Sequence, residues 1–400
     1  MAAVTRDERP RDPGPTRLGP AGDSDPELVA SIRERIERDG PLTFARFMEL
    51  ALYDPAHGYY MGPPERAGRG GDFLTAPEAT PLFGACVARQ VEEIWHRLGE
   101  PAPFVLREYG PGSGALALAL LDRLREDASA LLAALRYAPV EVNPHRRRET
   151  ADRLRAAGLA HLLSDADAAG PMTGCVLANE FVDALPVHRV RRVGGELQEL
   201  YVDWRDGWFR QAPGPPSTDA LAAYLERVGA HLEEGQETEV NLGARGWLER
   251  LAADLARGVV LIVDYAHEAA ELHGARRPEG TIKGSRAQTL ERDPLRNVGR
   301  QDLTAHVDLA ELRLAAADLG LDVLGSTTQA EFLAGNGFGE LLREALGRET
   351  SANAYLATRS AAMFLLDPRR TGGFRVLALG RGVPPDPPLR GLSVRIGRED

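Results

Sequence analysis

Short apolar runs separated by stretches of helical periodicity predict the framework of the chain. Between the runs, apolar residues recur every three or four positions, which predicts helices at 115–125, 144–157, 244–257 and 308–319. Each run is short and several are rich in branched residues, so the runs predict buried strands at 104–106, 137–142, 161–163, 174–178, 259–264, 321–326 and 374–379. Strands that alternate with helices predict an α/β protein with a doubly wound, mostly parallel sheet of seven strands.

More helices precede this framework, and the same apolar spacing predicts them at 26–38, 43–52 and 83–98. The connection 53–78 is long and rich in glycine and aromatic residues. Such a segment is typical of an active-site lid or binding loop, and an ordinary packed connector is an equal alternative. We therefore expect an N-terminal helical lobe with a lid loop over 26–100. Residues 1–25, rich in Pro, Arg and Asp, are expected to be a disordered tail.

Between the fourth and fifth expected strands, the apolar period changes from helical to alternating. Glycine-containing turns separate the alternating runs, so the pattern predicts strands at 188–193, 197–204 and 208–211, followed by a helix at 218–232. We expect 187–241 to be a β-rich insertion that forms a cap over the site. The main domain then spans 101–380, and a Pro-rich tail follows over 381–400.

A glycine-rich loop follows the first strand of this framework. Gly110, Gly112 and Gly114 stand at alternate positions, and Glu108 precedes them by two residues. A dinucleotide fold favours the spacing G-x-G-x-x-G, and a carboxylate beside the ligand would repel a pyrophosphate. The same carboxylate suits a cationic ligand such as the sulfonium and amino group of S-adenosylmethionine. Glycine loops of this kind are also found as plain tight turns.

Acidic residues also follow the next strands, at the edge where doubly wound folds bind ligands. Glu141 is expected to accept hydrogen bonds from ribose hydroxyls, and Asp165 from an adenine amino group. Asn179, Glu180 and Asp183 follow the fourth strand. Glu180, with Asp183 as its second, is our candidate to clamp a guanidinium for in-line transfer of a methyl group. The alternative is that this run caps a helix and packs.

Other polar residues carry weaker signals. His267 follows the fifth strand and is a candidate base or hydrogen-bond donor, although a lone histidine there is more often a loop residue with its bonds satisfied. The two acids and one histidine between Asp302 and Asp308 do not match common metal sites, and neither Cys86 nor Cys175 belongs to a zinc pattern, so we expect no metal.

Composition argues against two classes of partner, nucleic acids and membranes. The 400 residues are 43% hydrophobic and 27% charged, with a net charge of −11, which argues against nucleic acid as the main partner. No apolar run is long enough to span a bilayer, so no membrane insertion is expected. Lys283 is the only lysine, and this bias towards arginine is typical of a GC-rich bacterial genome and favours a cytoplasmic protein.

Several longer motifs resemble one known family. In chain order they are Phe44-Ala-Arg-Phe-Met-Glu-Leu-Ala-Leu-Tyr-Asp-Pro, Gly58-Tyr-Tyr, Gly71-Asp-Phe-Leu-Thr-Ala-Pro-Glu, Glu108-Tyr-Gly-Pro-Gly-Ser-Gly, Asn179-Glu-Phe-Val-Asp-Ala-Leu-Pro, Val263-Asp-Tyr and Asp302-Leu-Thr-Ala-His-Val-Asp. This set resembles the MidA family of S-adenosylmethionine-dependent methyltransferases, which includes a mitochondrial assembly factor of respiratory complex I. The match runs from about Pro41 to Leu379.

The resemblance implies a class I methyltransferase with a seven-stranded Rossmann-like sheet and S-adenosylmethionine as cofactor. Carried over by motif, Glu108 and the three glycines would hold the methionine part, Glu141 the ribose and Asp165 the adenine. Glu180 and the loop formed by Gly71, Asp72 and Phe73 would border the substrate, and Glu78 adds a further acid to the suspected lid.

Taken together, these features predict a cytoplasmic bacterial methyltransferase that modifies an arginine in a protein partner. Two other functions are kept as alternatives: a cofactor-binding assembly factor whose methyl transfer is vestigial, and a methyltransferase for a small-molecule oxygen or nitrogen. A nicotinamide enzyme is disfavoured by Glu108 and by the glycine spacing. A homodimer is left open.

Overall fold

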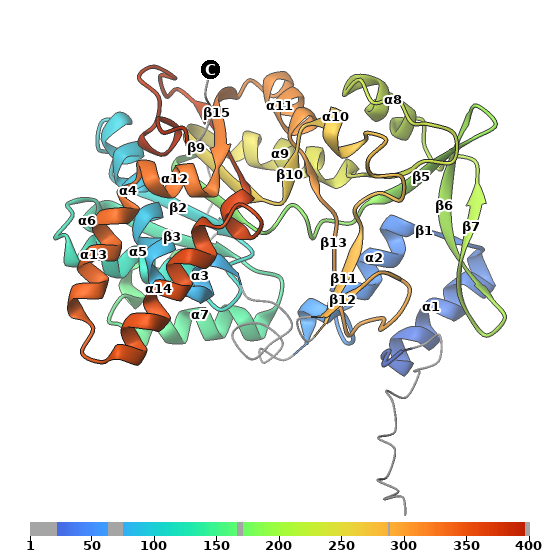
Figure 1. Cartoon of the computed structure of the whole chain (residues 1–400), viewed down its shortest axis with the longest axis horizontal. Coiled ribbons are helices and arrows are strands. Elements are labelled where there is room, and N and C mark those ends of the chain that lie inside the picture. Colours follow the sequence, from blue (N-terminus) through green and yellow to red (C-terminus); the bar gives the residue numbers. More distant parts are fainter. Residues whose placement is uncertain (1–21, 63–74, 166–170, 287–288, 397–400) are drawn as a thin grey trace, which may run out of the picture.

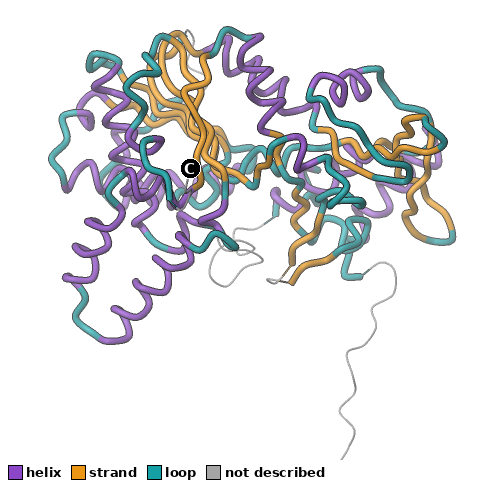
Figure 2. Tube along the Cα trace, turned by 45° about the horizontal axis from the view of Figure 1, so that its top comes forward, coloured by secondary structure: helices purple, strands orange, loops and turns teal. Residues whose placement is uncertain are grey.

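A six-stranded sheet forms the centre of the larger part of the molecule (Figures 1 and 2). The computed structural model describes residues 22–62, 75–165, 171–286 and 289–396. In spatial order the strands are β15 (Asp322–Thr328), β16 (Arg375–Arg381), β9 (Leu255–Asp264), β4 (Met172–Asn179), β2 (Phe104–Tyr109) and β3 (Leu135–Val140). β16 runs antiparallel to both of its neighbours, β15 and β9, and the other pairs in the sheet are parallel. The expected doubly wound, mostly parallel sheet is therefore confirmed.

The expected count of seven strands is wrong for the described part of the sheet. The segment expected as the third strand is instead a short 3-10 helix, Ala160–Leu162. Leu163 makes a single parallel bridge to Tyr137 of β3, and the backbone N–H of Ser164 donates to the Tyr137 carbonyl at 2.8 Å. Three residues between a helix and a polar turn are too few to build a ladder, so the chain touches the sheet edge once and leaves.

Helices cover both faces of the sheet and bury a separate apolar cluster on each. One cluster joins the sheet to α4 (Pro81–Arg97), α5 (Ala115–Glu126), α7 (Pro144–Ala156), α12 (Gln329–Gly335), α13 (Phe338–Arg348) and α14 (Ala352–Leu366). The other joins it to α9 (Leu242–Asp254) and α11 (Leu309–Asp318). Because both faces are covered, the central strands β4 and β9 are apolar and buried along most of their length.

A second sheet forms the other half of the molecule. Its strands are β1 (Leu42–Thr43), β5 (His188–Val193), β6 (Glu196–Arg205), β7 (Trp208–Gly214) and β8 (Glu237–Val240). The three strands expected in the insertion are confirmed, whereas the expected helix is shorter, α8 (Ala220–Arg227). The antiparallel pairing of β1 with β6 joins the N-terminal helices α1 (Pro26–Asp39) and α2 (Phe44–Tyr53) to the insertion. Phe47 of α2 packs against Phe209 of β7, with ring centroids 5.4 Å apart.

A small three-stranded sheet lies between the two halves (Figure 1). The apolar pattern predicts no strand between 266 and 305, but this segment contains β11 (Lys283–Arg286), β12 (Thr289–Glu291) and β13 (Asp302–Thr304), in the order β12-β11-β13. Near them are α10 (Ala269–Leu272) and the parallel pair β10 (Ala266–His267) and β14 (Val307–Asp308). These strands are short and largely polar, so they lack the apolar alternation by which strands are recognised.

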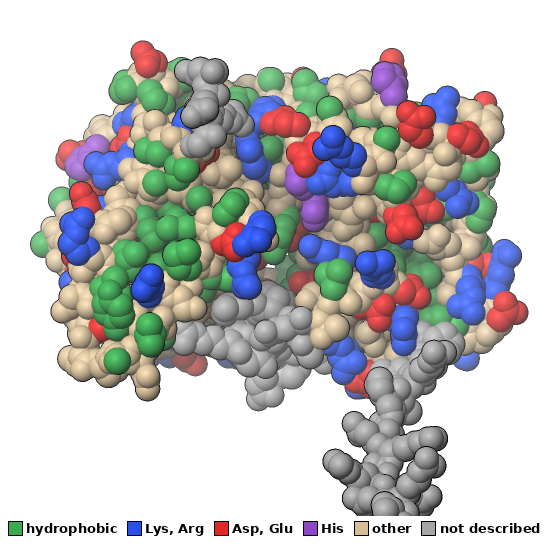
Figure 3. Space-filling view, in the orientation of Figure 1, with side chains coloured by type: hydrophobic (Ala, Val, Ile, Leu, Met, Phe, Trp, Pro, Cys, Tyr) green, Lys and Arg blue, Asp and Glu red, His purple; other side chains and the backbone are tan. Residues whose placement is uncertain are grey.

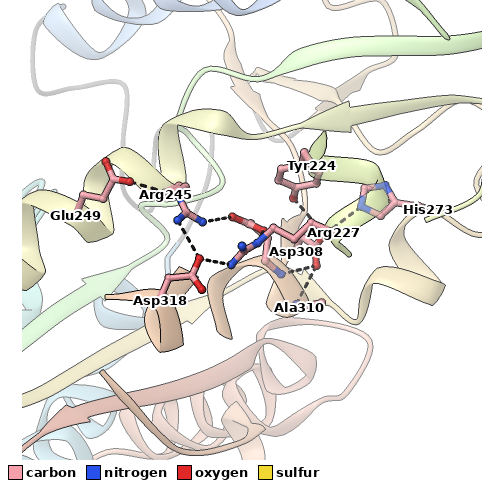
Figure 4. A network of polar contacts seen from close by, with 9 residues as sticks. Tyr224, Arg227, Arg245, Glu249, His273, Asp308, Ala310 and Asp318 are labelled. Carbon is pink, nitrogen blue, oxygen red and sulfur yellow. Dashed lines mark hydrogen bonds and ion pairs between the residues drawn. The ribbon is translucent and has the colours of Figure 1, made fainter. Parts of the chain in front are cut away.

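A network of polar contacts, buried around His273 and Asp308 and exposed at Asp318, ties the insertion to the main sheet domain (Figure 4). Arg227 of α8 contacts Glu311 at 3.1 Å and Asp318 at 2.7 Å, both on α11. His273 lies between Thr238 of β8, at 2.7 Å, and Asp308 at the start of α11, at 3.0 Å. Because these partners come from segments far apart in the sequence, the network fixes the insertion to the core.

The remaining short elements are η1 (Tyr59–Met61), α3 (Ala76–Ala79), α6 (Leu131–Ala134), η4 (Thr371–Gly373) and η5 (Arg390–Leu392). On the face shown in Figure 3, apolar side chains gather over α13 and α14, where Tyr355, Leu356 and Met363 are exposed. Of the helices that the structure describes, none has both the length and the apolar character needed to cross a membrane.

Candidate functional site

A cavity of about 770 Å³ lies at the carboxyl ends of the central strands. Its walls come from the loops after β2, β3, β4 and β9, from α2 and η1 of the N-terminal lobe, and from strands β11 and β13. Eight of the predicted site residues line it: Glu78, Glu108, Gly110, Gly112, Glu141, Asn179, Glu180 and Asp183. Parallel strands end at one edge, so residues far apart in sequence converge there.

The three glycines form the turn between β2 and α5. All adopt positive φ, at 64°, 54° and 75° for Gly110, Gly112 and Gly114, a region that side chains disfavour. A Cβ atom on Gly110 would lie 3.2 Å from the ring of Phe181, and one on Gly114 would lie 2.9 Å from Thr150. Gly114 caps α5 and does not itself line the cavity, but Ser113 and Ala115 on either side of it do.

Glu108 is the last residue but one of β2 and lines the cavity. The side chain is buried, and the hydroxyl of Tyr137 donates a hydrogen bond to its carboxylate at 2.6 Å. Burial raises the pKa of Glu108 from 4.5 to about 7. A cation that entered the cavity would lower this pKa again, because it would favour the charged carboxylate.

Glu141 lies at the end of β3, on the other side of the glycine loop. Its carboxylate accepts a hydrogen bond from the backbone N–H of Asn143 at 2.9 Å, and burial raises its pKa. This position suits the predicted ribose contact. Asp165, predicted to meet the adenine, is exposed and is not among the residues that line the cavity, so its role stays a prediction.

The turn after β4 brings three predicted residues together. Glu180 has φ of 49°, unusual for a residue with a side chain, and its backbone N–H donates to the Val263 carbonyl at 2.8 Å. The Glu180 carboxylate accepts hydrogen bonds from the side-chain amide of Asn179 at 3.2 Å and the backbone N–H of Ala76 at 3.4 Å. Burial, and then repulsion from Asp264, raise the pKa of Glu180 to about 8.

Asp264, which was not among the predicted site residues, holds this turn in place. One of its carboxylate oxygens accepts the backbone N–H groups of Phe181, Val182 and Asp183 at 3.3, 2.9 and 3.3 Å. The other accepts the N–H of Tyr265 at 2.8 Å. The sequence did contain a signal for this role of Asp264. The apolar strand expected to be buried ends in this carboxylate, and a buried carboxylate needs hydrogen-bond donors around it.

Two further carboxylates, those of Asp183 and Asp302, line the same cavity. Asp183 is buried, and crowding by Asp264, Asp302 and Glu180 adds to burial in raising its pKa far above the ordinary value. Asp302 of β13 accepts a hydrogen bond from the hydroxyl of Tyr60 at 2.6 Å. Asp302, Tyr60 and Lys283 were missed as site residues because strands β11 and β13 were not expected.

The structure does not bring His267 to the cavity. Its ring contacts His306 at 3.0 Å, Glu271 at 3.1 Å and Arg277 at 3.2 Å, and burial lowers its pKa. His267 therefore has several partners, in agreement with the alternative of a satisfied loop histidine.

The predicted lid lies only in part within the described residues. Glu78 accepts hydrogen bonds from Ser113 and Thr75, each at 3.2 Å, and so reaches the glycine loop. Gly71, Asp72 and Phe73 lie outside the described residues. In the part of the chain that the structure covers, no three His, Cys, Asp or Glu side chains are grouped to hold a metal ion.

The cavity fits S-adenosylmethionine by its donor and acceptor set. The glycine turn leaves backbone exposed at the start of α5, and Glu108 and Glu141 place carboxylates on either side of it. The side-chain oxygen of Asn179 is buried, and no described group donates a hydrogen bond to it. A buried acceptor without a donor is costly, and a ligand that carries N–H groups would satisfy it. Glu108, Glu141, Asn179 and the glycine turn would therefore hold the cofactor.

Comparisons with known proteins agree with this geometry. The profile of a family described as S-adenosyl-L-methionine-dependent methyltransferase matches residues 86–327, more than half of the chain. The chain is 31% identical over 391 residues to the mitochondrial protein arginine methyltransferase NDUFAF7 homolog of Drosophila melanogaster, covering 89% of this chain and 85% of that protein. It is 27% identical to the mitochondrial protein arginine methyltransferase NDUFAF7 of Homo sapiens, covering 86% and 81%.

Solved structures extend the similarity to the fold and to the ligand. A COG1565 superfamily protein from Burkholderia thailandensis, crystallised with S-adenosyl-homocysteine bound, superposes with a TM-score of 0.84 at 33% identity, covering 92% of this chain and 94% of that chain. A native crystal structure of a COG1565 superfamily protein from the same organism gives a TM-score of 0.81 at 32% identity. The chain therefore belongs to this MidA-like family of S-adenosyl-L-methionine-dependent methyltransferases, and S-adenosyl-L-methionine is its cofactor.

Proposed function

We propose that this methyltransferase transfers a methyl group to an arginine side chain of a protein partner. The observation that carries the proposal is the cluster of carboxylates beside the cofactor loop, in which Asp183 and Asp302 are buried and Glu180 is half-buried, and all three line the cavity. The names of the relatives, protein arginine methyltransferases, support the same substrate class.

The crowding of these carboxylates suits a cationic acceptor. Burial raises the pKa of Glu180 and of Asp183, and repulsion from neighbouring carboxylates raises both pKa values further. A bound cation would therefore stabilise the ionised carboxylates. A guanidinium is a planar cation with five N–H donors, and carboxylates hold it through paired, charge-assisted hydrogen bonds. Its binding would therefore restore the ionised state that burial disfavours.

Methylation also requires that a proton be removed. When bound, the cofactor supplies an electrophilic methyl group. The acceptor nitrogen would bond to this methyl group as the methyl–sulfur bond breaks and the neutral thioether leaves. The nitrogen would lose one proton, so that the product guanidinium keeps a single positive charge. Glu180, which becomes ionised when the guanidinium binds beside it, is the group suited to accept that proton. Asp264 assists by holding the backbone of the turn that carries Glu180 and Asp183.

A labelling experiment tests this function. Purified protein is incubated with cofactor labelled in its methyl group and a lysate of the source organism, and labelled polypeptides are hydrolysed to identify methylarginine. Wild type is expected to label at least one polypeptide, and Glu180→Gln to lose most of the label while still binding the cofactor product in calorimetry. Glu226→Gln, which changes an exposed carboxylate on α8, is the matched control and should label as wild type does.

Three results would refute the proposal. Labelled metabolites without labelled polypeptide would indicate a small-molecule methyltransferase. Cofactor binding with no labelled product at all would indicate an assembly factor without transferase activity. Label on a residue other than arginine would refute the arginine substrate while keeping the protein partner.

A further inference from the structure

The only lysine of the chain lies in this cavity, on a strand that sequence analysis did not foresee. Lys283 begins β11, which pairs antiparallel with β13 so that Lys283 is opposite Thr304 and Ser285 is opposite Asp302. Side chains alternate along a strand, so these four share one face, and all four line the cavity. Of the 48 lysine and arginine residues of the protein, all the others are arginines.

The surroundings of the ammonium group are aromatic on one side and acidic on the other. Its nitrogen lies 4.8 Å from the ring centroid of Tyr265, within the range of a cation–π contact. Burial lowers the pKa of Lys283, whereas the charges of Asp183 and Asp302 raise it. His306 faces the same region, and its own pKa is lowered by burial and by the charge of Lys283.

Lys283 acts on the two carboxylates at a distance rather than through contact. Among described residues, the contact recorded for its ammonium is the ring of Tyr265, no carboxylate oxygen lies within 4.0 Å of it, and the Asp183 carboxylate accepts no hydrogen bond from a described residue. The field of Lys283 nevertheless favours the ionised form of Asp183, against three neighbouring acids. The oxygens of Asp183 therefore remain available to an incoming ligand.

The choice of lysine over arginine is consistent with this role. A lysine ammonium is a compact charge, whereas an arginine carries a planar fork of donors that matches a carboxylate in a bidentate pair. An arginine at this position would supply the same charge but would compete with an arginine of the substrate for the same oxygens.

We propose that Lys283 is a positioning residue for the acceptor: its ammonium lowers the cost of ionising Asp183, so that this carboxylate becomes charged when the acceptor cation binds, while its oxygens stay available to that cation. The inference rests on the proposed function, in which these carboxylates bind a guanidinium. A purely structural lysine, packed on Tyr265, would have no effect on the ionisation of the two acids.

The first test does not require a substrate. Protein grown with ¹³C-labelled lysine gives one side-chain signal in NMR, since the chain has one lysine. The signal is expected to titrate below the ordinary lysine pKa of 10.5, and to move lower by about half a unit or more in Asp183→Asn or Asp302→Asn. A signal that titrates as free lysine, or that neither substitution moves, would overturn the proposal. Binding of the cofactor product by calorimetry shows whether each variant is folded.

The second test uses the pH profile of methyl transfer, measured with the labelled polypeptide. Lys283→Met removes the charge, so the acidic limb of the profile is expected to shift to higher pH by about one unit. On that limb the rate of methyl transfer should fall by about tenfold, and at high pH it should return to the wild-type rate. Lys283→Arg keeps the charge and should keep the position of the limb, with a raised KM. The matched control is Arg286→Met. It removes another cation of strand β11, one that pairs with Asp23.

The two tests separate the inference from the function on which it rests. If the loss in Lys283→Met is equal at every pH, or its profile coincides with that of wild type, Lys283 does not set the charge of the acids. If wild type labels no polypeptide, the proposed function fails, and the NMR titration still decides whether Lys283 is coupled to Asp183 and Asp302.

Discussion

Replacing Glu180 by Gln should stabilise the protein while it abolishes most of the activity. In the folded protein without ligands, the pKa of Glu180 lies at about 8, against an ordinary value of 4.5. Between these two values the folded state binds more protons than the unfolded state does. Its free energy of unfolding therefore falls as the pH rises through this window. A glutamine at this position has no charge to bury, so the variant escapes this loss.

The size of the effect follows from the size of the pKa difference. A shift from 4.5 to about 8 corresponds to a ceiling of about 5 kcal/mol once the carboxyl is fully ionised. The carboxyl faces a cavity that admits water, which lowers the cost of ionisation, so we expect about 1–2 kcal/mol. For a chain of 400 residues this corresponds to about 1–2 °C in Tm.

The assay is urea unfolding of wild type and Glu180→Gln without cofactor, from about pH 4 to about pH 9. The two proteins should have nearly equal stability at the acidic end, and the variant should gain progressively towards the alkaline end. Glu226→Gln, the exposed control on α8, should follow wild type throughout. A difference that does not grow with pH, or a variant that is less stable at the alkaline end, would refute the reasoning.

Three further predictions concern other parts of the molecule. Glu108→Ala should weaken binding of S-adenosylmethionine and of its demethylated product by about tenfold or more in calorimetry, because it removes a buried carboxylate from the cofactor loop. Asp264→Asn leaves one acceptor oxygen for four backbone N–H groups, so methyl transfer should fall by about tenfold or more while calorimetric binding of the product changes little. His273→Ala should lower the free energy of unfolding in urea by about 2–4 kcal/mol, since Thr238 and Asp308 lose a buried partner.

Each of these has an outcome that contradicts it. Unchanged binding in Glu108→Ala, with NAD as the negative control, would remove Glu108 from the cofactor site. If Asp264→Asn lost product binding and transfer equally, Asp264 would support the whole cavity rather than the turn after β4. His231→Ala, on an exposed histidine, is the control for His273→Ala, and equal effects of the two would show that the buried network adds no stability.

The sequence by itself determined the main sheet and one side of the site. Runs of branched apolar residues form strands wherever they are buried on both faces, and their alternation with amphipathic helices leaves the doubly wound sheet as the natural arrangement. Parallel strands end at one edge, so the residues after each strand could be grouped without coordinates. Glu108, the glycine turn, Glu141 and Glu180 were found in this way, and all reach one cavity.

Tertiary structure decided the opposite wall of the cavity. Lys283 and Asp302 lie about 20 residues apart in a polar segment without apolar alternation, and only the antiparallel pairing of β11 with β13 places them on one face. His267, three residues beyond Asp264, is turned away from the cavity by the pairing of β10 with β14. The pairing of β1 with β6 likewise joins the N-terminal helices to the insertion. Local periodicity shows which face of a segment is apolar, but which distant segment covers that face depends on long-range packing.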